Sequence, residues 1–248
     1  MSMNEPFVTI TTATFNSEQT LARTIQSVLD QTFTDIEYII MDGQSKDRTL
    51  EIAKGFEPLF AAKGIPYRII SEPDNGMYDA INKAISLANG KIIGNVNSDD
   101  FYEPSAVETV VREFKKEPFD MIYGNLRIIK DTGNFIKKAK YKRMAFTRYW
   151  NHPTTFITRE VLQTRPYACE SMYDDCDLML RLRRQGCRIR VVDQVLSNFT
   201  FGGMSTRKNW KETRERIRIR NDIYRKNGYG VIYCIDGWLI ETMKYLLG

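Results

Sequence analysis

Two adjacent carboxylates, Asp99 and Asp100, end the polar stretch 97–100, which follows the apolar segment 92–96. Like charges placed side by side repel, and each desolvated charge is costly, so a divalent cation is the usual reason for keeping such a pair. Carboxylates suit hard cations such as Mg²⁺ and Mn²⁺, which in turn bind phosphates. Asp is also common in turns and helix caps, and for the pair taken alone a turn is the simpler interpretation.

The segments around the pair predict an α/β fold. Short apolar segments that fit buried strands alternate with segments of helical periodicity. The predicted strands are 7–12, 36–41, 67–70 and 92–96, and the predicted helices are 21–29, 49–56 and 77–87. Asn16 fits the N-cap of the first helix, and Gly90 fits the C-cap of the third. This alternation predicts a mostly parallel sheet with right-handed crossovers.

Three polar loops, 42–47, 74–79 and 97–100, follow these strands. In parallel α/β sheets, ligands bind outside the carboxyl ends of the strands, so we expect the loops to gather at one edge. Together they bring carboxylates, amides and glycines to one crevice, as in a nucleotide site with a metal on the phosphates. The glycine-rich dinucleotide and P-loop motifs are absent, which disfavours those two classes of site.

The second half of the chain predicts a smaller region with antiparallel strands. A helix is expected at 105–114, and strands at 121–130 and 135–141 flank a turn at 131–134. His152 is the only histidine, and a lone histidine is most often structural. Asp174 and Asp175 precede a helix, where acids favour the helix dipole and cap the helix.

Composition places the chain among ordinary globular proteins. It has 248 residues, 42% of them apolar and 27% charged, with a formal net charge of +5. The four cysteines have no C-x-x-C spacing, so we expect no zinc site or disulfide framework and a reducing cytosol. No signal pattern or membrane-length apolar run occurs, which predicts a cytoplasmic protein.

Residues 207–248 combine a basic segment with an amphipathic one. Nine Lys or Arg residues stand against three acids in 207–226, and Val231, Ile235, Trp238 and Leu239 follow at helical spacing. This pattern fits docking on the inner face of the cell membrane, and equally helices packed on the domain or on a second subunit as a homodimer. Only Trp210 and Tyr224 interrupt the basic run, so a nucleic-acid-binding module is disfavoured.

Four motifs in this order resemble family 2 glycosyltransferases with the GT-A fold, and bacterial polysaccharide enzymes of the colanic acid type in particular. They are 11–16 (TTATFN), 41–49 (MDGQSKDRT), 72–83 (EPDNGMYDAINK) and 97–100 (NSDD). The resemblance covers nearly the whole chain. It implies a GT-A domain at 1–206, with a nucleotide-sugar half at 1–104 and an acceptor half at 105–206, followed by a C-terminal helical segment at 207–248.

The resemblance also implies a donor site for a nucleotide-diphosphate sugar, with UDP as the expected nucleotide and Mn²⁺ or Mg²⁺ as the metal. Asp42 would read the base, Asp99 would lie at the ribose, and Asp100 is the better candidate for the metal, with Asp99 as a second metal candidate. The expected donor-binding residues are Thr11, Thr14, Asn16, Asp42, Ser45, Asp74, Gly76, Asp79, Asn82, Lys83, Asn97 and Asp99. Met41 stands where many members carry an acid.

The implied reaction is inverting transfer of one sugar to a glycan acceptor, expected to be lipid-linked, in bacterial surface polysaccharide biosynthesis. Such transfer needs a base for the acceptor hydroxyl, and the motif places that role on Asp175, with Asp174 in support and His152 near the diphosphate or acceptor. The segment 201–206 resembles a loop that folds over the active site. The Q-x-x-R-W motif of processive synthases is absent. A binding protein of the same fold without catalysis is the alternative.

Overall fold

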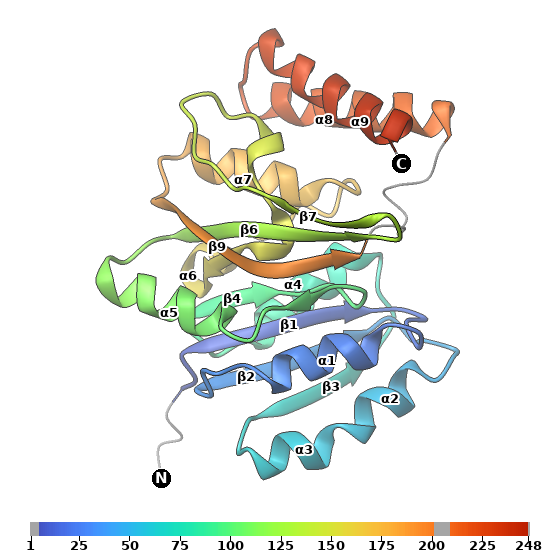
Figure 1. Ribbon diagram of the computed structural model, residues 1–248, viewed down its shortest axis with the longest axis vertical. Coiled ribbons are helices and arrows are strands. Elements are labelled where there is room, and N and C mark those ends of the chain that lie inside the picture. The colour runs from blue at the N-terminus through green and yellow to red at the C-terminus, as the bar shows by residue number, and fades with distance from the viewer. Residues whose placement is uncertain (1–4, 201–208, 248) are drawn as a thin grey trace.

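The structure is a computed structural model that describes residues 5–200 and 209–247 (Figure 1). A nine-stranded mixed sheet has the order β3-β2-β1-β4-β8-β6-β9-β5, with β7 paired to β6. The strands are β1 Val8–Thr14, β2 Ile36–Asp42, β3 Tyr67–Ser71, β4 Ile92–Asn95, β5 Phe101–Tyr102, β6 Met121–Lys130, β7 Gly133–Lys137, β8 Phe156–Thr158 and β9 Ile189–Thr200. The predicted loop 201–206 lies outside the described residues.

Helices cover both faces of this sheet, as the alternation of strands and helices predicts. The α-helices are α1 Leu21–Leu29, α2 Thr49–Gly55, α3 Glu57–Ala62, α4 Met77–Leu87, α5 Ala106–Lys116, α6 Arg159–Thr164, α7 Asp174–Arg184, α8 Trp210–Lys226 and α9 Cys234–Leu247. Short 3₁₀ turns occur at η1 Thr147–Tyr149, η2 His152–Thr154 and η4 Val231–Tyr233.

The N-terminal half of the sheet is parallel, and this part of the prediction is confirmed. β1 pairs in parallel with β2 and β4, and β2 with β3. The second half is mixed, because β8 runs antiparallel to both β4 and β6 while β9 runs parallel to β6. The sheet therefore continues from the first half into the second without a break.

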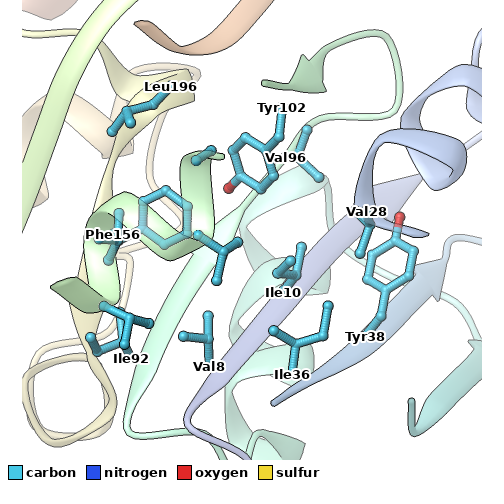
Figure 2. Close-up of a cluster of buried hydrophobic side chains, with 14 of the residues drawn as sticks. Val8, Ile10, Val28, Ile36, Tyr38, Ile92, Val96, Tyr102, Phe156 and Leu196 are labelled. Atoms are coloured by element: carbon cyan, nitrogen blue, oxygen red, sulfur yellow. The ribbon is translucent and has the colours of Figure 1, made fainter. Parts of the chain in front are cut away.

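Alternate residues of the strands feed two hydrophobic cores, one on each face of the sheet. In β2, Tyr38 and Ile40 belong to the core under α1 and α5, whereas Ile39 and Met41 belong to the core under α4 and α7. Figure 2 shows the first core, in which Val8, Ile36 and Ile92 come from three neighbouring strands. This packing holds the carboxyl ends of β1, β2 and β4 beside one another.

Two predicted helix caps are wrong. The N-cap of α1 is Thr20, without a side-chain cap, whereas Asn16 lies in the preceding loop with φ = 49°. α4 ends at a cap formed by Ala88, two residues before Gly90. Glycine is needed at position 90 for a different reason, because a Cβ there would lie 2.3 Å from the backbone nitrogen of Thr9.

The C-terminal helices α8 and α9 pack on the domain, at the opposite end of the molecule from α3 (Figure 1). Glu241 of α9 has no exposed surface, and it accepts from Nε of Arg216 (2.9 Å) and Nε of Arg220 (2.8 Å). It also accepts from Tyr173 Oη at 3.0 Å, at the start of α7. Two of the nine basic residues in 207–226 thus attach the C-terminal helices α8 and α9. The guanidinium group of Arg220 also stacks 4.1 Å above the Tyr173 ring.

This attachment can be tested with Glu241→Gln. Removing the charge takes away the carboxylate that compensates the buried Arg220 and Arg216, although Glu212 stays 3.6 Å from Arg216. Breaking a buried ion pair costs about 3–5 kcal/mol. The control is Glu215→Gln, since Glu215 pairs with Arg218 at 2.6 Å but its side chain is 51% exposed. That change should cost about 1 kcal/mol or less. Urea unfolding measures both, and equal losses of stability would contradict the role assigned to Glu241.

Candidate active site

Hydrogen bonds join the loops after β1 and β2, and this series of hydrogen bonds ends on Asp42. The backbone N–H of Asn16 donates to Ser45 Oγ (2.8 Å), and Asn16 Oδ1 accepts from the backbone N–H of Lys46 (2.8 Å). Ser45 Oγ donates to Asp42, which also accepts from Ser71 Oγ at 2.6 Å. Asp42 has no exposed surface. It therefore holds three chain segments together, and because it is fully buried a nucleobase could contact it only after its neighbours move.

The loop before α4 packs directly on the loop after β2. A Cβ on Gly43 would lie 2.4 Å from Oδ2 of Asp74, so this contact requires glycine. Oδ1 of Asp74 accepts from the backbone N–H of Gly76 (2.8 Å), whose φ of 111° is also a glycine conformation. The structure thus brings these two predicted donor loops together.

A chain of side-chain hydrogen bonds leads from β1 to the acid pair. Thr11 Oγ1 donates to Asn95 Oδ1 (3.1 Å), Asn95 Nδ2 donates to Asn97 Oδ1 (3.2 Å), and Asn97 Nδ2 donates to Asp100 Oδ2 (3.1 Å). Thr14, at the carboxyl end of β1, is buried, and its Oγ1 has no hydrogen-bond partner in the described part of the chain. Thr11, Asn97 and Asp100 therefore form one connected network at the predicted edge.

Asp99 and Asp100 lie in a setting that disfavours their charge. Burial raises the pKa of Asp100 well above its usual range, and the negative charge of Asp99 raises it further. The Asn97 side chain and the backbone amide of Thr200 partly offset this rise. Burial also raises the pKa of Asp99, which keeps some exposed surface, while Asp100 has none. A cation beside this pair would favour the ionised form.

The acid pair fits a divalent metal that shares its coordination with a phosphate. Oδ1 of Asp100 is buried and makes no hydrogen bond within the described residues. The same residues contain no cluster of three or more His, Cys, Asp or Glu that could hold a metal ion. Mg²⁺ is commonly held by one or two carboxylates together with substrate phosphates and water, and this donor set matches that arrangement.

Three of the predicted donor-site residues make contacts that order the fold around α4. The backbone N–H of Asn75, followed by the charge of Lys83, holds the pKa of Asp79 below its usual range. The carboxylate of Asp79 lies 3.4 Å from Nζ of Lys83. Asn82 Nδ2 donates to the backbone O of Tyr167 (2.9 Å), and its Oδ1 accepts from the N–H of the same residue (3.1 Å). Asn82 thus fastens the segment around Tyr167 to α4.

A cavity of about 510 Å³ lies next to the donor edge, and Asn97, His152 and Asp175 all line it. Nδ1 of His152 is 3.6 Å from Oδ2 of Asp175, which is too long for a hydrogen bond. Apolar side chains form much of the remaining wall, among them Leu126, Ile128, Phe135, Trp150, Ile240 and Met243. The cavity therefore joins the loop of the acid pair to the start of α7.

The two acids at the start of α7 have different surroundings. Asp174 is 1% exposed and accepts from the N–H of Glu170 (3.0 Å), the N–H of Ser171 (2.8 Å) and Ser171 Oγ (3.1 Å). Asp175 lines the cavity and accepts from the N–H of Cys176 (2.8 Å). Asp174 shapes the turn that presents Asp175, which alone of the two reaches the cavity.

Several residues of the site carry no pattern that sequence reasoning could detect. Arg23 of α1 donates to the backbone O of Asp99 at 2.9 Å, and Ser17 Oγ lies 2.9 Å from Ser98 Oγ. Arg148 and Arg220, far apart in the chain, both line the cavity. Each of these contacts arises from the fold, because the partners are distant in sequence and of common residue types.

The sheet, the acid pair at its strand ends and the adjoining cavity define a glycosyltransferase of the GT-A fold. A model of the family described as glycosyl transferase family 2 matches residues 9–172. The chain belongs to this family. The expected fold class, family and enzyme class are thereby confirmed.

Relatives and solved structures agree with this assignment. The chain is 30% identical to a PGL/p-HBAD biosynthesis glycosyltransferase of Mycobacterium tuberculosis over 87% of this chain and 85% of the relative. It is 37% identical to a chondroitin synthase of Escherichia coli over 54% of this chain, but this match spans only 19% of that longer protein.

Two solved structures show the same fold. S. aureus TarS 1–349 superposes with a TM-score of 0.71 at 16% identity, covering 96% of this chain and 72% of that one. The mannosyltransferase PcManGT of Pyrobaculum calidifontis, in complex with GDP-Man and Mn²⁺, gives a TM-score of 0.69 at 13% identity, covering 98% and 73% of the two chains.

Alanine variants distinguish the two acids of α7. Asp174→Ala removes three hydrogen bonds to a buried carboxylate, and we expect a loss of about 3 kcal/mol of stability. Asp175→Ala removes one local hydrogen bond and should cost about 1 kcal/mol or less. Thermal unfolding followed by circular dichroism measures both. A larger loss for Asp175→Ala would show that the two roles are reversed.

Proposed function

We propose that this glycosyltransferase is metal-dependent and inverting, and that it moves one sugar from a UDP-sugar to a glycan acceptor. The observation that carries the proposal is the cavity that Asn97 and Asp175 both line, since Asn97 donates a hydrogen bond to Asp100. A donor bound at the strand ends would present its anomeric carbon toward this cavity. Residues 1–104 would then bind the donor and 105–206 the acceptor.

Asp175 is the proposed base. An acceptor hydroxyl bound in the cavity would give its proton to Asp175 as its oxygen forms the bond to the anomeric carbon and the bond to the diphosphate breaks. Asp174 would position this carboxylate through the turn at 170–171. His152, at 3.6 Å from Asp175, would stabilise its charge or contact the acceptor or diphosphate.

Asp99 and Asp100 are the proposed residues for Mn²⁺ or Mg²⁺. When bound, the cation would neutralise charge that develops on the departing diphosphate. The proposed division gives Asp100 to the metal and Asp99 to the ribose. The burial of Asp100 requires a movement of its neighbours for direct contact, while Asp99 keeps exposed surface and can serve the metal as well. The mannosyltransferase with the similar fold was solved with Mn²⁺, and TarS with UDP-GlcNAc.

We further propose a lipid-linked glycan acceptor at the inner face of the cell membrane, in bacterial surface polysaccharide biosynthesis. The apolar wall of the cavity supports an acceptor with an apolar part. The relatives named as chondroitin synthases support a polysaccharide as the class of product. No helix in residues 5–200 and 209–247 is long and apolar enough to cross a membrane.

The role of Asp175 is tested by Asp175→Asn. We expect transfer to fall by about 10²- to 10⁴-fold, the usual contribution of a positioned base, while UDP-sugar binding is unchanged. Asp222→Asn is the control, since Asp222 lies on the exposed side of α8, paired with Arg225. Initial rates with a radiolabelled donor measure transfer. Near-normal turnover by Asp175→Asn would move the role of base to another residue.

The metal role is tested by calorimetry with UDP, in the presence and absence of Mn²⁺. We expect Mn²⁺ to raise the affinity by about tenfold or more, because coordination of a phosphoryl oxygen is worth several kcal/mol. Asp99→Asn and Asp100→Asn should each remove this gain, whereas Asp131→Asn, in the hairpin turn after β6, should keep it. An affinity for UDP that is the same with and without Mn²⁺ in the unsubstituted protein would reject the metal site.

A further inference from the structure

The basic run of the C-terminal segment presents less positive charge than its composition indicates. Arg216 and Arg220 are buried against Glu241. Other cations of α8 pair with neighbouring carboxylates: Arg218 with Glu215 at 2.6 Å, Arg225 with Asp222 at 3.3 Å, and Lys226 with Glu170 at 2.6 Å. These ion pairs reduce the positive charge that α8 could offer to an anionic surface.

A cationic surface lies between the end of α7, the segment before η1 and the turn between α8 and α9. A cavity of about 490 Å³ opens there, and we name it the arginine pocket. Its charged and aromatic lining consists of Tyr141, Arg143, Arg183, Arg184, Tyr229 and Tyr233. Within the described part of the chain, no carboxylate lines this cavity.

Contacts with rings and carbonyl groups hold two of these arginines in place. The guanidinium group of Arg183 stacks 4.3 Å from the centre of the Tyr141 ring and donates to the backbone O of Arg143 at 3.0 Å. That of Arg184 lies 5.8 Å from the centre of the Tyr229 ring. Rigid guanidinium groups bind phosphate well, because their paired N–H donors match two phosphate oxygens.

Exposed apolar side chains adjoin the arginine pocket. Gly230 and Tyr233 line the pocket, and the two residues between them, Val231 and Ile232, are 76% and 54% exposed. Ile235 and Trp238 follow in the sequence, on α9, at 54% and 53% exposure. Single exposed apolar residues are ordinary, but four within eight residues, beside a cationic pocket, match the composition of membrane-surface segments.

We propose that the arginine pocket binds the phosphate groups of anionic phospholipids while Val231, Ile232, Ile235 and Trp238 enter the boundary between headgroups and acyl chains. Positive charge and apolar surface together identify a lipid surface as the occupant, since a nucleic acid would not need the apolar edge. α9 would then lie between the membrane and the cavity that its residues Ile240 and Met243 line. This inference rests on the proposed function only for its purpose, the supply of a membrane-borne acceptor.

The test is sedimentation of the full chain with vesicles of phosphatidylcholine alone or mixed with phosphatidylglycerol. We expect binding to the mixed vesicles only. A basic residue near an anionic surface contributes about fivefold in affinity, so Arg143→Ala combined with Arg184→Ala should weaken binding about 25-fold. The matched control is Arg218→Ala combined with Arg225→Ala, which removes the same charge outside the pocket and should leave binding unchanged.

A second pair of substitutions tests the apolar edge. Ile232→Ser combined with Trp238→Ser should weaken binding to the mixed vesicles even at low salt, while circular dichroism shows the same unfolding temperature as the unsubstituted protein. Both side chains are more than half exposed, so their removal leaves the fold intact. Retained vesicle binding in this variant would overturn the proposed insertion.

Other results would also overturn the proposal. One is equal weakening of vesicle binding by the pocket pair and the control pair of substitutions. Another is thermal stabilisation of the protein by glycerol 3-phosphate without sedimentation of the protein with vesicles. The proposal also fails if the protein binds RNA in place of vesicles, or forms a dimer that dissociates on Trp238→Ser. Vesicle binding is measured without a donor, and transfer to a water-soluble acceptor should be unaffected by all these variants. Loss of the docking site and failure of the proposed sugar transfer are thereby distinguished.

Discussion

The structure depends on keeping two like-charged carboxyl groups, the buried Asp100 and the partly exposed Asp99, at the edge of the parallel half of the sheet. Burial and mutual repulsion raise the pKa of Asp100, so the pair costs free energy in the absence of a cation. Strand pairing and the hydrogen bonds from Thr11 through Asn95 and Asn97 hold it in place. Costs of this kind are typical of functional sites, where a bound ligand supplies the missing interaction.

The second half of the chain places the carboxylate of Asp175 in the cavity that Asn97 also lines. The turn held by Asp174 directs Asp175 to the cavity, and Glu241 anchors the C-terminal hairpin against the same turn through Tyr173. The C-terminal helices α8 and α9 therefore form part of the wall of this cavity, through Arg220, Ile240 and Met243. One continuous sheet joins the two halves of the chain, and α8 and α9 lie at the opposite end of the molecule from α3 (Figure 1).

Periodicity and turn chemistry predicted the first four long strands and the bounds of α4 from the sequence. Short strands such as β5, with two residues, carry no periodic signal, and their pairing is decided by distant partners. Asn16 was wrongly predicted as a cap, because the same residue type also serves a loop with positive φ. The motif pointed to both Asp174 and Asp175, but only the fold shows which one is buried. Arg143 and Arg184 are adjacent to no motif, so the arginine pocket depends entirely on tertiary structure.

The most direct test of the donor site is a crystal structure of the protein with UDP and Mn²⁺, with the metal located by anomalous scattering. We expect Mn²⁺ at about 2.1 Å from a carboxylate oxygen of Asp99 or Asp100, where it would also contact the diphosphate. We expect the uracil ring between the loops that follow β1 and β2. A nucleotide bound away from the ends of β1, β2 and β4, or a metal without contact to either carboxylate, would contradict this expectation.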